Sequence, residues 1–212
     1  MAISSKYMRV SIAIQAVLII ALQGVLYSQS NFSDSIDSYK PNVEFFMEEI
    51  TLEVTDSTAH VKGVYYFSNN TSKEFDFPVL FPFYTDSLIS YPHVIEPYLL
   101  ENGQKNKLSY KDSPNFSGIR FRIPLQADKV TAWHLDYCQK ISAKRAVYII
   151  TSTAAWKKPL DKATYYFIAP ESFSGVEVWP EADTAYMDNG NIIYKCVREN
   201  FMPSQDMEIL WK

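Results

Sequence analysis

Residues 59–68 of the chain are AHVKGVYYFS, a run in which apolar and polar side chains alternate. The alternation divides the run into an apolar face and a polar face, namely Ala59, Val61, Tyr65 and Phe67 against His60, Lys62 and Ser68. A period of two is that of a β-strand, whose successive side chains point to opposite sides. The stretch therefore predicts a strand in a sheet with one buried and one solvated face.

Similar runs, short and rich in Val, Ile, Tyr, Phe and Thr, recur along the rest of the chain and predict further strands. With the first run, the expected strands are 49–54, 59–68, 74–83, 107–111, 118–124, 130–139, 146–151, 163–169, 175–179, 191–198 and 207–211. Asn-Gly pairs at 102–103 and 189–190 predict tight hairpins, because both central residues of such a turn need positive φ. No stretch after residue 30 sustains a helical period for ten residues. We therefore expect an all-β fold, an antiparallel two-sheet β-sandwich, in which 85–98 is an irregular crossing between sheets.

The N-terminal residues follow a different pattern. Two basic residues, Lys6 and Arg9, precede an apolar run at 10–27, and small polar residues close it at 28–30. This order is typical of a secretory signal peptide. We expect residues 1–30 to be a signal peptide, 31–46 a short tether and 47–212 the β-sandwich domain.

A signal peptide predicts that the mature protein is secreted or periplasmic, with no membrane span after cleavage. The alternative is an uncleaved anchor helix, since the apolar run is nearly long enough to cross a bilayer. Removing residues 1–30 leaves 18 basic against 24 acidic side chains, a net charge of −6. Nucleic acids demand clustered basic charge, so no nucleic-acid partner is expected.

Two pairs of residues could hold an ion or a disulfide. His134 and Asp136 share one face of the expected strand 130–139, within reach of a common metal ion, but no second ligand pair is visible in the sequence. A solvated strand face is the preferred interpretation, and we expect neither a metal site nor a cofactor. Cys138 and Cys196 permit one disulfide in an oxidising compartment. They fall on strand faces of opposite character, which leaves the bond open.

Aromatic residues are in excess, with 15 Tyr, 13 Phe and 4 Trp. Planar rings pack in cores but also stack on sugars and peptides. The candidate ligand-binding residues are Trp156, Lys157 and Lys158, in a polar segment between two apolar strands, and Trp179, which precedes a proline. The alternative for Trp156 is that it folds back and caps the core.

No nucleophile elbow, Gly-rich phosphate loop or helical zinc motif occurs in the sequence, and no catalytic residue is assigned. We therefore expect an exported, non-enzymatic β-sandwich with a binding or structural role at the cell envelope, where its partner is a protein or a glycan. The alternative is a secreted hydrolase acting on envelope glycan or peptide, with carboxylates assembled from separate strands.

Two stretches carry a family resemblance. They are ITLEVTDSTAHVKGVYYFSNNTSKEFDFPVLFPF at 50–83 and AVYIITSTAAWKKPLDKATYYFIAP at 146–170. The first resembles the opening of non-catalytic β-sandwich domains in exported bacterial proteins of unknown function and, more distantly, the N-terminal sandwich of zinc aminopeptidases. The second is similar to a strand, Trp loop and strand of the former group. The resemblance implies a non-catalytic sandwich, since no catalytic motif of the aminopeptidases is present.

Overall fold

The computed structural model describes residues 42–212, so the expected signal peptide and most of the expected tether lie outside the described residues. Within the described residues, no helix has the length and apolar character needed to cross a membrane. The elements are β1 (Val43–Val54), β2 (Thr58–Asn69), β3 (Phe75–Pro82), β4 (Val94–Glu101), β5 (Gln104–Lys107), β6 (Tyr110–Asp112), β7 (Gly118–Leu125), β8 (Lys129–Lys140), β9 (Arg145–Tyr148), the 3₁₀ helix η2 (Thr151–Trp156), β10 (Leu160–Pro170), β11 (Glu177–Trp179), β12 (Thr184–Asp188), β13 (Asn191–Phe201) and β14 (Met207–Leu210).

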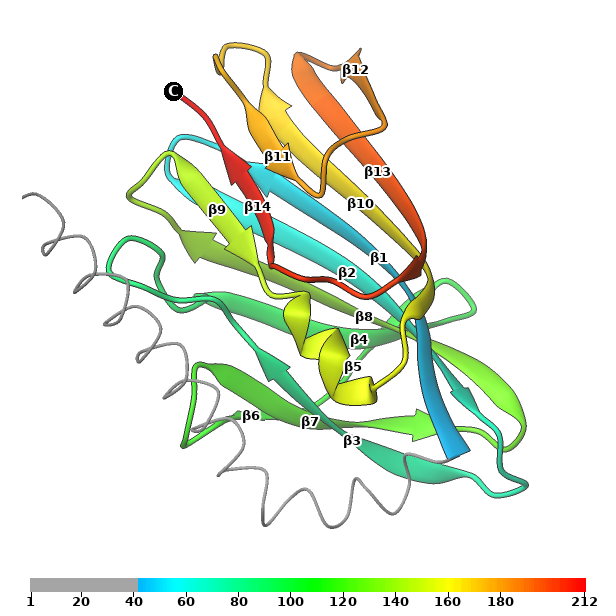
Figure 1. The fold of residues 1–212 in the computed structure, drawn as a ribbon. Coiled ribbons are helices and arrows are strands. Elements are labelled where there is room, and N and C mark those ends of the chain that lie inside the picture. The colour runs from blue at the N-terminus through cyan, green and yellow to red at the C-terminus, as the bar shows by residue number, and fades with distance from the viewer. Residues whose placement is uncertain (1–41) are drawn as a thin grey trace, which may run out of the picture.

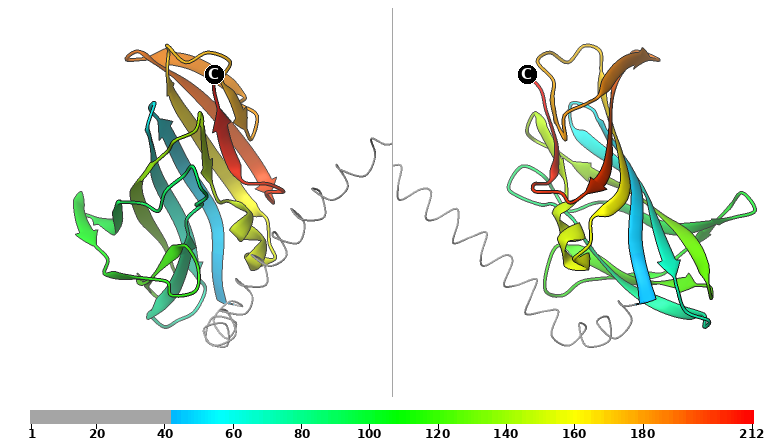
Figure 2. Two further views of the ribbon diagram at one scale, coloured as in Figure 1. Left: turned by 90° about the vertical axis from the view of Figure 1, so that its left-hand side faces the viewer. Right: turned by 45° about the vertical axis from the view of Figure 1, so that its right-hand side comes forward.

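The strands form three sheets, which Figure 1 shows as two layers. The large sheet has the order β12-β13-β10-β1-β2-β8-β4-β5. The two three-stranded sheets, β11-β14-β9 and β3-β7-β6, lie against one of its faces (Figure 2). The all-β prediction is thus confirmed. The prediction of two sheets is wrong in number, because the second layer is divided between two separate hydrogen-bonded sheets.

One strand pair departs from the expected antiparallel arrangement. Strands β1 and β10 pair in parallel, with Ile50 opposite Tyr165, whereas the other pairs between named strands in the described residues are antiparallel. Between β1 and β10 the chain forms four further strands of the large sheet, β2, β4, β5 and β8, and most of the second layer. A parallel pair needs such a long connection.

The expected irregular crossing at 85–98 is partly wrong, because β4 begins at Val94 and pairs with β8. Pro97 lies within β4, opposite Leu135. Its carbonyl accepts from the Leu108 N–H at 2.8 Å, on the side away from β8. The proline nitrogen faces that same side, so the missing N–H removes no bond from the β4–β8 ladder.

The core between the layers is largely aromatic. Tyr65 of β2 stacks on Trp133 of β8 with ring centroids 4.2 Å apart, and Phe81 of β3 meets Tyr65 edge-on. The Tyr65 hydroxyl also lies 2.6 Å from that of Tyr148 on β9. Side chains from the large sheet and from both small sheets therefore meet at Tyr65, and most of the aromatic excess is explained by packing.

Strand β1 begins at Val43, inside the segment expected to be a tether. Its register against β2 shifts between Phe45 and Met47, which is a β-bulge. A bulge adds one residue and reverses the alternation beyond it. Phe45 faces the core before the bulge, and Glu48, with 3% of its surface exposed, faces the core after it.

Candidate functional site

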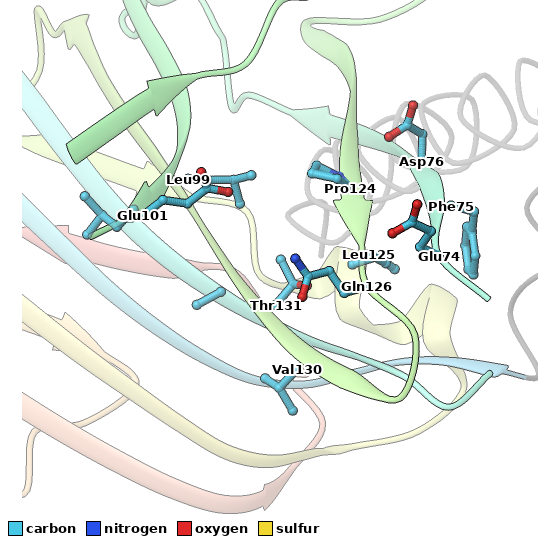
Figure 3. Close-up of a pocket in the computed structure, with 12 residues that line it drawn as sticks. Glu74, Phe75, Asp76, Leu99, Glu101, Pro124, Leu125, Gln126, Val130 and Thr131 are labelled. Atoms are coloured by element: carbon cyan, nitrogen blue, oxygen red, sulfur yellow. The ribbon is translucent and has the colours of Figure 1, made fainter. Parts of the chain in front are cut away.

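An open cleft of about 550 Å³ lies where the β3-β7-β6 sheet diverges from the large sheet (Figure 3). Its walls come from the start of β3, the ends of β4 and β7, and the start of β8. The lining residues are Glu74, Phe75, Asp76, Leu99, Leu100, Glu101, Pro124, Leu125, Gln126, Val130, Thr131 and Ala132.

The cleft opens here because the chain passes from the small sheet to the large one. It leaves β7 at Leu125, turns through Asp128 at φ 50°, and enters β8. The buried Asn69 holds this turn beside the β2–β3 loop, since its Nδ2 donates to the Gln126 carbonyl at 3.0 Å and to the Lys73 carbonyl at 2.8 Å. One end of the cleft is therefore fixed by side-chain hydrogen bonds to backbone groups.

Apolar side chains form both the floor and part of the rim. Leu125 and Leu99 are buried, with 1% and 8% of their surfaces exposed. Leu100 and Val130 are 48% and 57% exposed, although both are large and apolar. Exposed apolar groups that adjoin a polar rim are typical of an interaction site.

Three carboxylates complete the lining, which contains no Lys, Arg or His. Figure 3 shows Glu101 on one side of the cleft and Glu74 and Asp76 on the other. Glu101 accepts a hydrogen bond from Asn106 Nδ2 at 2.6 Å. In residues 42–212, no hydrogen bond or ion pair engages the side-chain oxygens of Glu74 or Asp76.

This arrangement suits a ligand that offers an apolar group to the floor and a positive charge to the rim. Within the described range, no cluster of three or more His, Cys, Asp or Glu side chains could hold a metal ion. The cleft therefore offers apolar contact surface and carboxylate acceptors to a ligand.

The predicted Trp156 site lies elsewhere. Trp156 ends η2, is half-buried, and packs within 6.0 Å of the rings of Phe45, Phe67 and Phe77. These contacts agree with the alternative in which Trp156 caps the core.

The two lysines beside Trp156 are exposed. Lys157 adopts a left-handed conformation, φ 56°, and its N–H donates to the Ala154 carbonyl, so it terminates the helix. Lys158 forms an ion pair with Glu44 of β1. A ligand-binding role for these three residues stays a prediction.

Trp179 closes β11 and is half-buried, with its ring centroid 6.5 Å from that of Phe201. Neither it nor the Trp156 segment contributes to the lining of the cleft. The rings of Trp156 and Trp179 pack against different aromatic residues.

His134 and Asp136 lie on one face of β8, as predicted, but they have other partners. The His134 ring stacks on Tyr98, with centroids 4.9 Å apart, and partial burial lowers its pKa. Asp136 forms an ion pair with Lys105 at 3.3 Å. Lys105 in turn lies over the Tyr98 ring, 4.2 Å from its centroid. The four side chains form a packed cluster on a solvated face.

Cys138 and Cys196 are both free, so the disulfide that the sequence left open does not form. Cys138 is on β8 and Cys196 on β13, and three strands separate them. At the usual spacing between strands their backbones lie roughly 19 Å apart. A disulfide requires Cα atoms within about 7 Å of each other.

Sequence reasoning missed the cleft entirely. One local signal was available, because Leu99 and Leu100 are adjacent and precede the Asn102-Gly103 turn. Neighbouring residues of a strand point to opposite faces, so one of two adjacent leucines is on the outer side. The carboxylates come from separate segments, and their proximity depends on the packing of the two sheets.

No protein-family model matches the chain, and no curated protein matches its sequence. Its fold is similar to that of a Legionella pneumophila crystal structure named as a candidate nutrient binding protein, with 11% identity, a TM-score of 0.59, and coverage of 81% of this chain and 67% of that one. An M1 zinc metallopeptidase from Deinococcus radiodurans aligns at 9% identity and a TM-score of 0.45, over 80% of this chain and 42% of that one. The similarity to the Legionella structure confirms, at the level of the fold alone, the distant resemblance inferred from the sequence.

Proposed function

We propose that this chain is an exported, non-enzymatic β-sandwich that binds a partner at the cell envelope through the cleft between β3, β4, β7 and β8. The observation that carries the proposal is the combination of exposed Leu100 and Val130 with three carboxylates around a buried floor. The Legionella protein of similar fold is named as a nutrient binding protein, and that name supports a binding role for this chain.

The chemistry of the cleft favours a protein segment over a neutral glycan. A segment with a Lys or Arg next to an apolar side chain can place the cation against Glu74, Asp76 or Glu101 and the apolar group on the leucines. The mature net charge of −6 is also complementary to a basic partner.

A binding experiment tests the cleft directly. The first probe is a short peptide of alternating Lys and Leu residues, and the second is a set of oligosaccharides cut from the envelope glycan. Each is titrated calorimetrically into the processed protein, which is the chain after removal of the proposed signal peptide. We expect the peptide to bind, the double variant Glu74→Gln and Asp76→Asn to weaken it, and added salt to weaken it further. Glu49→Gln, which removes an exposed carboxylate from β1 outside the cleft, is the matched control. Equal peptide affinity in the double variant would contradict the assignment of the cleft.

Export has its own test. The apolar run at 10–27 and the small residues that follow support a cleaved signal peptide, with a mature N-terminus proposed near Asn31. N-terminal sequencing of the protein from the export fraction is expected to begin there. An intact Met1 in the membrane fraction would support the anchor instead.

A hydrolase acting on envelope glycan or peptide is the second candidate, favoured by one observation. Glu101 lies across the cleft from Glu74, and glycoside hydrolysis uses two carboxyl groups on opposite sides of the scissile bond. Product release from envelope glycan or peptide by the processed protein, abolished in both Glu74→Gln and Glu101→Gln, would establish this activity. Absence of product in the unmodified protein would exclude it for those substrates.

A further inference from the structure

The edges of the three sheets differ in how they are protected against pairing with another chain. Proteins protect edge strands with Lys, Pro, bulges or burial. In the part of the chain that the structure describes, five of the six edges have such features: Lys105 and Lys107 on β5, Pro78 and Pro82 on β3, Lys111 on β6, Pro180 directly after β11, and largely buried side chains on β9.

The sixth edge, β12, has none of these features within its five residues, and its one charged side chain is Asp188 at the hairpin end. A bulge-type hydrogen bond lies directly before the strand, where the Asp183 N–H donates to the Lys195 carbonyl opposite Thr184. Its five residues, TAYMD, include no Lys, Arg or Pro, and its register against β13 runs without a shift. All five are exposed, with Tyr186 at 48% and Met187 at 66%. Figure 1 shows β12 at the end of the large sheet with no strand beyond it. Such an edge can accept another strand.

The hairpin geometry determines which backbone groups of β12 face outward. Asn189 and Gly190 have φ values of 49° and 77° and form a two-residue turn, so Asp188 and Asn191 are its hydrogen-bonded closing pair. Hydrogen-bonded and non-hydrogen-bonded pairs alternate along an antiparallel ladder. The N–H and C=O groups of Ala185 and Met187 therefore point away from β13, toward the free edge.

The sequence of β12 is complementary to itself in one antiparallel register. A two-fold axis at Tyr186 places Ala185 opposite Met187 of the second copy and aligns all five residues. Both residues of that pair point outward, so the two symmetric pairs can exchange four backbone hydrogen bonds. The small Ala185 leaves room for the Met187 side chain, and Asp188 faces a Thr184 hydroxyl, so no like charges are opposed.

We propose that two copies of this chain pair antiparallel along β12 and join their eight-stranded sheets into one continuous sheet. The interface is closed by the two-fold axis, so pairing ends at two copies. The two Tyr186 side chains meet on the solvated face of the sheet, and Met187 packs over Ala185 on the other face. This proposal is independent of the cleft and of its ligand.

Sedimentation equilibrium of the processed protein over a range of concentrations tests the pairing. We expect the mass of two chains. Met187→Pro removes an outward N–H that β13 does not use, and is expected to give the mass of one chain with an unchanged circular dichroism spectrum. Met187→Lys adds a charge to the same edge and is expected to act likewise. Tyr110→Lys, on the β6 edge, is the matched control and is expected to leave the mass of two chains.

Cross-linking tests the register. Tyr186 faces itself across a non-hydrogen-bonded pair, whose Cα atoms lie about 4.5 Å apart, within disulfide range. In a Cys138→Ser background, oxidation of Tyr186→Cys is expected to link two chains, whereas Thr184→Cys, opposite Asp188, is expected to stay unlinked. A single-chain mass at every concentration, or equal linking of both variants, would overturn the proposal.

Discussion

The Tyr165 hydroxyl donates a hydrogen bond of 2.6 Å to Oε1 of Glu48 inside the core. The two residues lie on β10 and β1, the parallel strand pair of the large sheet. Burial raises the pKa of Glu48 to about 7, although the hydrogen bond from Tyr165 acts in the opposite direction. The folded protein therefore contains a carboxyl group that gains a proton near neutral pH.

Replacing Glu48 with Gln is expected to stabilise the protein at alkaline pH. The folded pKa of about 7 exceeds the ordinary value of 4.5, so the folded state binds more protons and stability falls as pH rises from about 4.5 through 7. Above pH 8 the ionised carboxylate costs about 3 kcal/mol, which the neutral amide avoids. Urea unfolding between pH 5 and 9 measures the difference.

The neighbouring Glu49 provides the control for that experiment, because it is exposed on the opposite face of β1. Glu49→Gln is expected to leave the pH dependence of unfolding unchanged. The free energies of unfolding of Glu48→Gln and of the unmodified protein are compared at pH 5 and at pH 9. An equal difference at the two pH values would contradict the raised pKa of Glu48.

Gly63→Ala is expected to destabilise the protein by about 1 to 3 kcal/mol. A Cβ at Gly63 would lie 2.2 Å from the Tyr65 hydroxyl oxygen, and the Tyr65 ring is held by its stack on Trp133. Gly103→Ala is the control for crowding, since nothing lies within 4 Å of its Cβ position, although its φ of 79° adds backbone strain. The Cβ would also lie 2.5 and 2.7 Å from two carbons of the Tyr65 ring, so Tyr65→Ala, which removes the ring as well as the oxygen, is the variant that relieves the clash. Thermal unfolding of Gly63→Ala, Tyr65→Ala and the double variant measures whether the two losses of stability are additive. Additive losses would argue against the clash.

Trp156→Ala is expected to lower the free energy of unfolding by about 2 to 4 kcal/mol, because its ring packs on Phe45, Phe67 and Phe77. Lys158→Ala removes ion pairs with Glu44 and Asp161 at the surface and is expected to cost about 1 kcal/mol or less. Chemical denaturation of the two variants makes the comparison. Unchanged stability in Trp156→Ala, together with lost partner binding, would instead support the predicted contact site.

The two cysteines are expected to react with an alkylating reagent at very different rates. Cys138 is partly exposed, whereas Cys196 is fully buried on β13 and burial raises its pKa to about 11. Mass spectrometry is expected to find one label on the native protein and two after unfolding in denaturant. The protein as isolated under oxidising conditions is expected to contain both free thiols, and a mass lower by two hydrogens would contradict this.

Much of the secondary structure was predictable because its determinants are local. The alternation in 59–68 specifies β2 and its buried face, and the Asn-Gly pairs at 102–103 and 189–190 occupy tight turns with positive φ, as predicted. Strand β12 was missed because its five residues are exposed on both faces and show no alternation of burial. Strand β4 was missed altogether because Pro97 suggested an irregular crossing, although its nitrogen faces away from β8.

The sequence by itself determined most of the strands, most of their faces and the hairpins, because side-chain alternation and turn geometry act over a few residues. Tertiary structure decided the parallel pairing of β1 with β10, the division of the second layer into two sheets, and the cleft between them. It also placed Glu48 beside Tyr165, since the β1 bulge turns that carboxylate inward. These features depend on contacts between residues that are distant in the chain, and such contacts form only when the sheets pack together.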